Sequence, residues 1–411
     1  MPESRNEAYS FPILRAFGRN KTIKFSFLLS SIFALLLCFP ACRVLAAEPI
    51  VFGVSLGLTG KFSPVSVDMQ NGIRLWERQI NEKGGIIGRP VKVLIKDDQS
   101  DPEIAKKIYR SYIDSGDVDF YIGPYSTTLT AAAISEVEKA NVPMVATAAS
   151  SASLWENGYK NLLGLLMVAP NFSLGFLEIA AINGHSRYAI ISDNSPFGRS
   201  IAEGARHWAK DFGLEVVVNE EFNKGRHDLT AFAQKAADAK ATAIIVTGHY
   251  DEAVDMRRAL ASIKYEDVAY FSAVGPAVPK YLEDLGPLAD KTFSTAWWSH
   301  QVEHQSGDFD LFLNPYRKVY NKTPDHNVAL IYAAGQVYEA AIIRANSVDP
   351  NKVRQALYDL DTLTIIGRYG VNSNGKQTKN FLLVNQWQNG QVYTVWPEKI
   401  ASEKPVIRQV E

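Results

Sequence analysis

The stretch IVFGVSLGLTGKFSPVSVDMQNGIRLWERQINEKGGIIGRPVKVLI, residues 50–95, contains one complete strand–helix–strand unit. Residues 50–54 and 91–95 are short β-branched runs typical of strands. Residues 65–83 are predicted to form a helix because four large apolar side chains recur on one helical face. These are Met69, Ile73, Trp76 and Ile80. Two strands joined by such a crossover run parallel, so the unit predicts a parallel sheet covered by helices.

The same alternation continues along the chain and restarts near residue 188. Further strands are predicted at 120–122, 143–146, 188–192, 216–218, 243–247 and 268–271. Further helices are predicted at 102 onward, 129–140, 197–212, 229–239, 252–263, 308–320, 327–346 and 350–357. Residues 381–387 and 392–397 flank Asn389-Gly390, which predicts a hairpin with a type I′ turn. The pattern indicates an α/β protein with two doubly wound parallel-sheet lobes.

The N-terminus has the three parts of a secretory signal peptide, which we predict to be residues 1–47. A basic flank that includes Arg19 and Lys24 precedes an apolar run over 25–41, and Val44 to Ala47 form a small-residue exit. Cleavage is expected within 46–48. A retained membrane anchor and a lipoprotein acylated at Cys42 remain open as alternatives. No later segment is expected to approach spanning length.

Composition excludes several function classes. Cys38 and Cys42 both lie in the predicted leader, so the mature chain would have no disulfide, thiolate metal site or cysteine nucleophile. Removing residues 1–47 changes the net charge from −1 to about −5, which gives no reason to expect nucleic acid as a partner. A mature length of about 360 residues favours two domains.

Motifs for chemistry are weak. Residues 53–57 match the G-x-S-x-G nucleophile elbow around Ser55, which leaves a hydrolase as an alternative, but an elbow needs earlier strands to have built the sheet. Residues 55–61 lack the leading glycine of a phosphate-binding loop. His300 and His304 have the spacing of metal ligands without a third ligand. We therefore expect no cofactor, no metal and no enzymatic activity.

Three segments, taken together in order and spacing, resemble one family. They are Asn81 to Pro90 followed by Asp97 to Pro102, Ile122 to Thr128, and Val142 to Ala146. They are similar to the branched-chain amino acid (Leu/Ile/Val) binding group of type I periplasmic binding proteins, which serve ATP-binding-cassette (ABC) transporters. The resemblance covers essentially the whole mature chain.

The resemblance implies two lobes joined by a hinge of three crossovers. The first would comprise residues 48–167 plus 298–362, and the second 168–297 plus 363–411. The lobes would close on a small-molecule ligand in the periplasm, and the closed form, a monomer, would be presented to the membrane permease of an ABC transporter. A periplasmic sensor subunit that signals to a membrane protein remains an alternative.

The candidate ligand-binding residues follow the predicted strands. Ser126 and Thr127 lie where a strand leads into a helix, a position whose free N–H groups suit a carboxylate. The resemblance implies that this segment and Ala148, Ala149 and Ser150 hold the ligand's carboxylate. It also implies that two aromatic residues, Phe197 and Tyr250, contact the ligand from the second lobe.

The chain departs from the family pattern at several positions. Val65 and Ser66 replace an aromatic residue and a glycine in the first loop. Near Val274 the family has an acidic residue that balances a bound amino acid's ammonium. We therefore expect a small carboxylate or amide as ligand, with amino acids still open if Asp251 or Asp193 substitutes for that acid. For Trp297-Trp298, both hinge packing and ligand stacking remain open.

Overall fold

Two separate β-sheets organise the chain in the computed structural model, which describes residues 47–303 and 307–410. The first sheet is parallel throughout and has the strand order β2-β1-β3-β4-β5. Its strands are β1 Ile50–Leu56, β2 Val91–Asp97, β3 Phe120–Ile122, β4 Met144–Ala146 and β5 Leu162–Gly164. The predicted fold class is confirmed.

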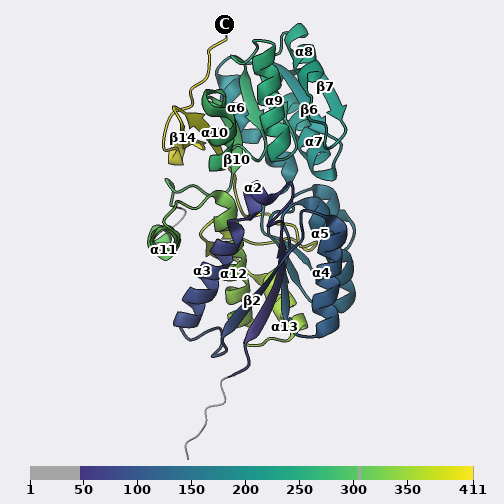
Figure 1. Cartoon of the computed structure of the whole chain (residues 1–411), viewed down its shortest axis with the longest axis vertical. Coiled ribbons are helices and arrows are strands. Elements are labelled where there is room, and N and C mark those ends of the chain that lie inside the picture. The colour runs from purple at the N-terminus through teal and green to yellow at the C-terminus, as the bar shows by residue number, and fades with distance from the viewer. Residues whose placement is uncertain (1–46, 304–306, 411) are drawn as a thin grey trace, which may run out of the picture. The chain divides into compact units, whose positions relative to one another are not determined.

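Helices cover both faces of this first sheet. α3 and α12 pack together on one face, and α4 and α5 on the other (Figure 1). The helices are α2 Ser63–Ser66, α3 Met69–Glu82, α4 Pro102–Ser115, α5 Thr127–Ala140, α11 Asn314–Tyr320, α12 His326–Ala345 and α13 Pro350–Asp359. We call the first sheet with these helices the first lobe. As its sequence predicts, Asp101 caps α4, because its Oδ1 accepts hydrogen bonds from the N–H groups of Glu103 and Ile104.

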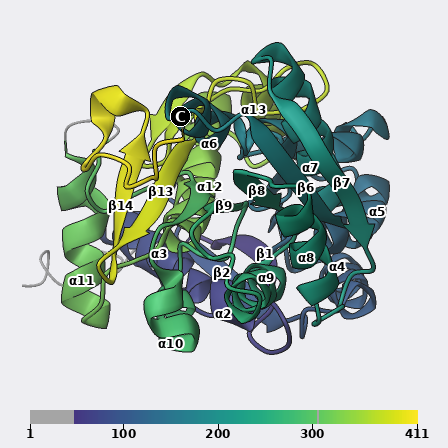
Figure 2. The same ribbon diagram turned by 90° about the horizontal axis from the view of Figure 1, so that it is seen from above.

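The second sheet has the order β14-β13-β10-β9-β8-β6-β7, with β14 and β7 at its edges (Figure 2). Its strands are β6 Arg187–Asp193, β7 Glu215–Phe222, β8 Ala243–Val246, β9 Ala269–Ser272, β10 Thr292–Ala296, β13 Leu383–Gln388 and β14 Gln391–Trp396. Its helices, which complete the second lobe, are α6 Leu174–Ile182, α7 Pro196–Asp211, α8 Thr230–Asp238, α9 Tyr250–Ser262 and α10 Pro279–Leu285. The predicted hairpin is confirmed, with φ of 52° at Asn389 and 78° at Gly390.

The described chain passes between the two sheets after β5, after β10 and after α13. On the third passage β11 (Thr362–Thr364) and β12 (Gly367–Tyr369) form a small antiparallel pair. The residues that follow contact the first lobe: Trp155 Nε1 donates to the Gly375 carbonyl at 3.1 Å, and Gln377 Nε2 donates to the Leu165 carbonyl at 3.3 Å. The predicted lobe boundaries themselves stay a prediction.

Several local predictions were wrong. The helix predicted over 65–83 is divided into α2 and α3, because the Ser66 hydroxyl bonds to the carbonyls of Gly57 and Phe62 at 2.8 and 2.7 Å and holds α2 in the loop after β1. The short elements β10 and α10 were not predicted. α12 is long and apolar enough to span a membrane by length and composition, contrary to expectation. However, 67% of its apolar window is buried, as in the core helix of a globular lobe.

The predicted leader, with Cys38 and Cys42, falls in residues 1–46, outside the described residues. His304 lies outside them as well.

Candidate ligand-binding site

The candidate residues of the first lobe lie at the carboxyl ends of β3 and β4. Ser126 is the N-cap of α5, with φ of 81°, and its Oγ accepts a hydrogen bond from the Leu129 N–H at 3.4 Å. Thr127 Oγ1 accepts hydrogen bonds from the backbone N–H groups of Ser150 and Ser151, both at 3.3 Å. The structure therefore brings Ser126, Thr127 and Ser150 together, as the loop geometry predicted.

The two alanines of this loop differ in exposure. Ala149 is fully buried, whereas Ala148 is half-buried and packs against the main core. Neither has a side chain that could bond to a ligand, so any role is one of shape and of backbone groups.

In the second lobe, Phe197 lies in the first turn of α7 and is buried. Its ring stacks on the His249 imidazole with the centroids 4.8 Å apart. Across the gap, the same imidazole contacts the rings of Phe62 at 4.9 Å and Tyr125 at 5.8 Å, both from the first lobe. Four aromatic rings from two lobes thus meet at one point.

Tyr250 does not join this cluster. Its hydroxyl donates a hydrogen bond to Asp284 Oδ2 at 2.7 Å, within the second lobe. Tyr250 and His249 are neighbours at the start of α9, and the chain directs the histidine rather than the tyrosine toward the first lobe. The sequence analysis missed His249. Like Ser126 and Thr127, it lies just beyond the carboxyl end of a strand, here β8, and this position could have identified it.

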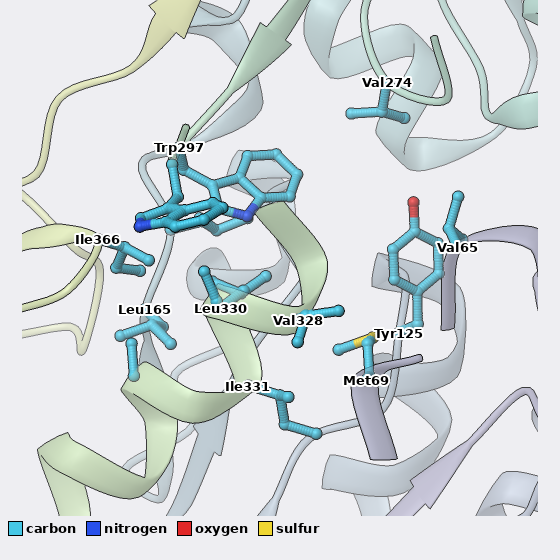
Figure 3. Close-up of a cluster of buried hydrophobic side chains, with 14 of the residues drawn as sticks. Val65, Met69, Tyr125, Leu165, Val274, Trp297, Val328, Leu330, Ile331 and Ile366 are labelled. Carbon is cyan, nitrogen blue, oxygen red and sulfur yellow. The ribbon is translucent and has the colours of Figure 1, made fainter. Parts of the chain in front are cut away.

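Apolar side chains form the floor beside this cluster. Figure 3 shows Val274, after β9, opposite Val65 and Tyr125, with the hydroxyl end of Tyr125 pointing toward Val274. Met69 and Val328 lie below them, and each of these side chains is at most 3% exposed. Two of the three positions at which the sequence departs from the family pattern, 65 and 274, therefore lie in the same buried cluster between the lobes.

A buried carboxylate lies at the edge of the aromatic cluster. Glu252 is 2% exposed; its Oε2 accepts a hydrogen bond from the His249 N–H at 2.8 Å, and its Oε1 lies 3.3 Å from Lys61 Nζ of the first lobe. Burial alone would raise the pKa of Glu252, but Lys61 and these donors hold it below its usual value. Sequence reasoning named Asp251 and Asp193 instead, and missed this residue.

The two acids named from sequence have other surroundings. Asp193 is fully buried and its Oδ1 accepts a hydrogen bond from the Ser195 hydroxyl at 2.8 Å, while its Oδ2 has no partner among the described residues. Burial raises the pKa of Asp193. Asp251 is half-buried, and desolvation together with the neighbouring Glu252 raises its pKa.

The tryptophan pair lies at the second passage between the sheets. The Trp297 ring stacks on the His326 imidazole at 4.1 Å, and its Nε1 donates to the His326 carbonyl at 2.7 Å. Trp298 lines a groove of about 460 Å³ with His300, Asp325 and the β13–β14 hairpin. This groove shares no residue with the predicted ligand contacts, so it does not define their site.

The weaker chemical motifs have ordinary structural partners. Ser55 is fully buried on β1, and its hydroxyl donates to Asp98 Oδ2 at 2.7 Å. Within residues 47–303 and 307–410, no group of three His, Cys, Asp or Glu side chains has a metal-binding arrangement. The expectation that the protein is not an enzyme stays a prediction.

Known proteins resemble this chain over most of its length. A Leu/Ile/Val-binding protein homolog of Brucella abortus is 24% identical and covers 87% of this chain and 93% of its own length. The leucine-, isoleucine-, valine-, threonine- and alanine-binding protein of Pseudomonas aeruginosa is 25% identical over 84% of this chain and 91% of its own.

Solved structures share the fold. The substrate-binding protein LivJ of Streptococcus pneumoniae, in complex with isoleucine, aligns with a TM-score of 0.76 at 23% identity, covering 84% of this chain and 98% of its own. The leucine-binding protein LivK of Thermotoga maritima gives 0.77 at 22% identity, covering 85% and 100%. The family model described as periplasmic binding protein matches residues 49–391. The chain therefore belongs to the periplasmic binding protein family.

Proposed function

We propose that the protein is the periplasmic substrate-binding receptor of an ABC importer, which closes its two lobes on a small polar ligand and delivers it to a membrane permease. The observation that carries this proposal is the meeting of strand-end loops from two separate sheets. Ser151 Oγ donates to the Pro196 carbonyl at 3.0 Å, and the Ala152 N–H donates to Ser200 Oγ at 3.2 Å, both across the lobes. Loops at strand carboxyl ends are where open α/β sheets bind ligands.

The chemistry of the meeting point supports a small ligand with one polar end. The N–H groups of Ser150 and Ser151 in the loop after β4, together with those of the first turn of α5, suit a carboxylate or amide oxygen. Val65 and Val274 offer apolar contact. Amino acids, amides and small carboxylates all fit this description. The relatives' names, which cite leucine, isoleucine and valine, support the same size class. Export by a signal peptide and a monomeric state belong to the same proposal.

A ligand screen by thermal unfolding tests the proposal. The protein, purified after export, is melted with amino acids, amides and small carboxylates. A true ligand at about 100 times its Kd stabilises the folded state by about 2.7 kcal/mol, so the melting temperature rises with concentration.

Thr127→Val then tests the place of binding. It removes the hydroxyl that holds the Ser150 and Ser151 N–H groups in place beside α5. Because the loop after β4 then loses the contact that positions these donors, we expect at least a tenfold rise in Kd by calorimetry. The matched control is Thr128→Val at the adjacent, half-buried threonine, which should bind normally. A screen without any ligand, or equal binding by both variants, would count against the proposal.

A further inference from the structure

An ion pair links the two lobes, and its two side chains differ in burial. Lys61 lies between β1 and α2 in the first lobe, and Glu252 lies in the first turn of α9 in the second. Their charged atoms are 3.3 Å apart although 191 positions separate them in sequence. The side chain of Glu252 is 2% exposed, whereas that of Lys61 is 28% exposed.

Both oxygens of this carboxylate have partners. Oε2 accepts from the His249 N–H, and Oε1 accepts from Lys61. A carboxylate this deeply buried needs a partner, since an unpaired buried charge is strongly destabilising. Lys61 therefore places an ammonium group of the protein itself against this carboxylate, at the edge of the aromatic cluster.

A second cation lies beside the first. Lys224 Nζ is 6.0 Å from the Phe62 ring centroid, and Lys61 Nζ is 5.5 Å from the same ring. The other buried acid, Asp193, accepts the Ser195 hydroxyl at Oδ1, and its Oδ2 has no hydrogen-bond partner among the described residues. Burial raises the pKa of Asp193, which favours the neutral form of this acid over the charged form that would attract an ammonium. A ligand ammonium would thus meet two lysines and, at Glu252, a carboxylate that is already paired.

A carboxylate on the ligand, in contrast, would find hydrogen-bond donors in the first lobe. The N–H groups of Ser150 and Ser151 share one acceptor, Thr127 Oγ1, at 3.3 Å each. These bonds lie beyond the usual N–H···O range, so a carboxylate oxygen would be the stronger acceptor. An α-ammonium on the ligand could pair with Glu252 only by displacing Lys61. The ligand ammonium would lose its hydration without adding an ion pair to the complex.

We propose that Lys61 acts as a built-in counter-ion for Glu252 and makes the receptor selective for carboxylates without an α-amino group, such as 2-oxo acids, over the corresponding amino acids. This inference rests on the proposed function and names the ligand class of the same site. Lys61 sets specificity by keeping Glu252 unavailable to an ammonium on the ligand.

Matched ligand pairs test the inference. Leucine, valine, phenylalanine and glutamate are each compared by calorimetry with the 2-oxo acid that has the same side chain. We expect the wild-type protein to bind the oxo acid at least tenfold more tightly in any pair that binds. Lys61→Met should shift this ratio at least tenfold toward the amino acid, because Glu252 becomes free to accept an ammonium. Lys61→Arg should keep the wild-type preference, and Lys92→Met, at an exposed lysine on β2, should change nothing.

The outcomes separate the two proposals. Tighter binding of the amino acids by wild type, or a ratio unchanged by Lys61→Met, would overturn the role of Lys61 and leave the receptor function intact. If no compound of the screen or of the pairs binds at millimolar concentration, the receptor function itself is contradicted, and the ligand class with it.

Discussion

Among single residues, the neighbours His249 and Tyr250 at the start of α9 contact different lobes. Tyr250 bonds to Asp284 within its own lobe, whereas His249 stacks on Phe197 and reaches the first lobe. We expect Tyr250→Phe to leave the ligand Kd unchanged and to lower the free energy of unfolding by about 1 kcal/mol, the net value of one hydrogen bond.

His249→Ala, in contrast, should weaken ligand binding at least tenfold, because it empties the centre of the aromatic cluster that joins the lobes. Calorimetry and urea unfolding on the two variants measure both effects. A loss of affinity in Tyr250→Phe equal to that in His249→Ala would show that the ligand contacts the tyrosine after all.

Among the secondary-structure elements, α3 and α12 pack closely because Gly335 of α12 has no side chain and leaves room for the indole of Trp76 on α3. A methyl group on Gly335 of α12 would overlap the indole of Trp76 on α3. In an exposed helix, glycine to alanine is stabilising by up to about 1 kcal/mol. Here we expect Gly335→Ala to lower the free energy of unfolding by about 1–3 kcal/mol, the usual cost of overpacking.

Urea unfolding measures this change in the free energy of unfolding, and a second variant shows whether the contact with Trp76 causes it. In a Trp76→Leu background the indole is absent, so Gly335→Ala should become neutral or stabilising. Equal destabilisation in both backgrounds would place the strain somewhere other than the α3–α12 contact.

At the scale of the whole molecule, buried neutral histidines make stability depend on pH. Burial lowers the pKa of both His249 and His326 to about 3, from 6.5. Between these values the unfolded chain binds protons that the folded chain does not, so stability is present above pH 6.5 and is lost as pH falls toward 3. Each histidine contributes a slope of up to about 1.4 kcal/mol per pH unit in that window.

His326→Phe separates this titration from packing. The phenyl ring can keep the stacking on Trp297 but cannot bind a proton. We expect the free energy of unfolding of the variant, measured in urea at pH 5 and pH 7, to fall less steeply toward low pH than that of wild type. Parallel pH profiles would mean that His326 does not titrate on unfolding.

The strand–helix alternation, the parallel sheets and the strand-end loops could all be predicted from sequence, because each depends on residues that are neighbours along the chain. The proximity of Ser126, Thr127 and Ser150 was predicted in this way, since the carboxyl ends of adjacent parallel strands lie at one edge of a sheet. The short elements β10 and α10 escaped prediction because stretches of five and seven residues carry too little periodicity.

The contacts between side chains of the two lobes could not be predicted from the sequence. The pairing of Lys61 with Glu252 joins loops from two different sheets, and no local pattern relates residues 191 positions apart. The choice of His249 over Tyr250 depends on the direction in which α9 leaves β8, which packing of the second lobe sets. Local periodicity and backbone geometry were enough to predict the architecture and the place of the candidate site. The contacts around the candidate site exist only when both lobes are folded together, so no local pattern could predict them.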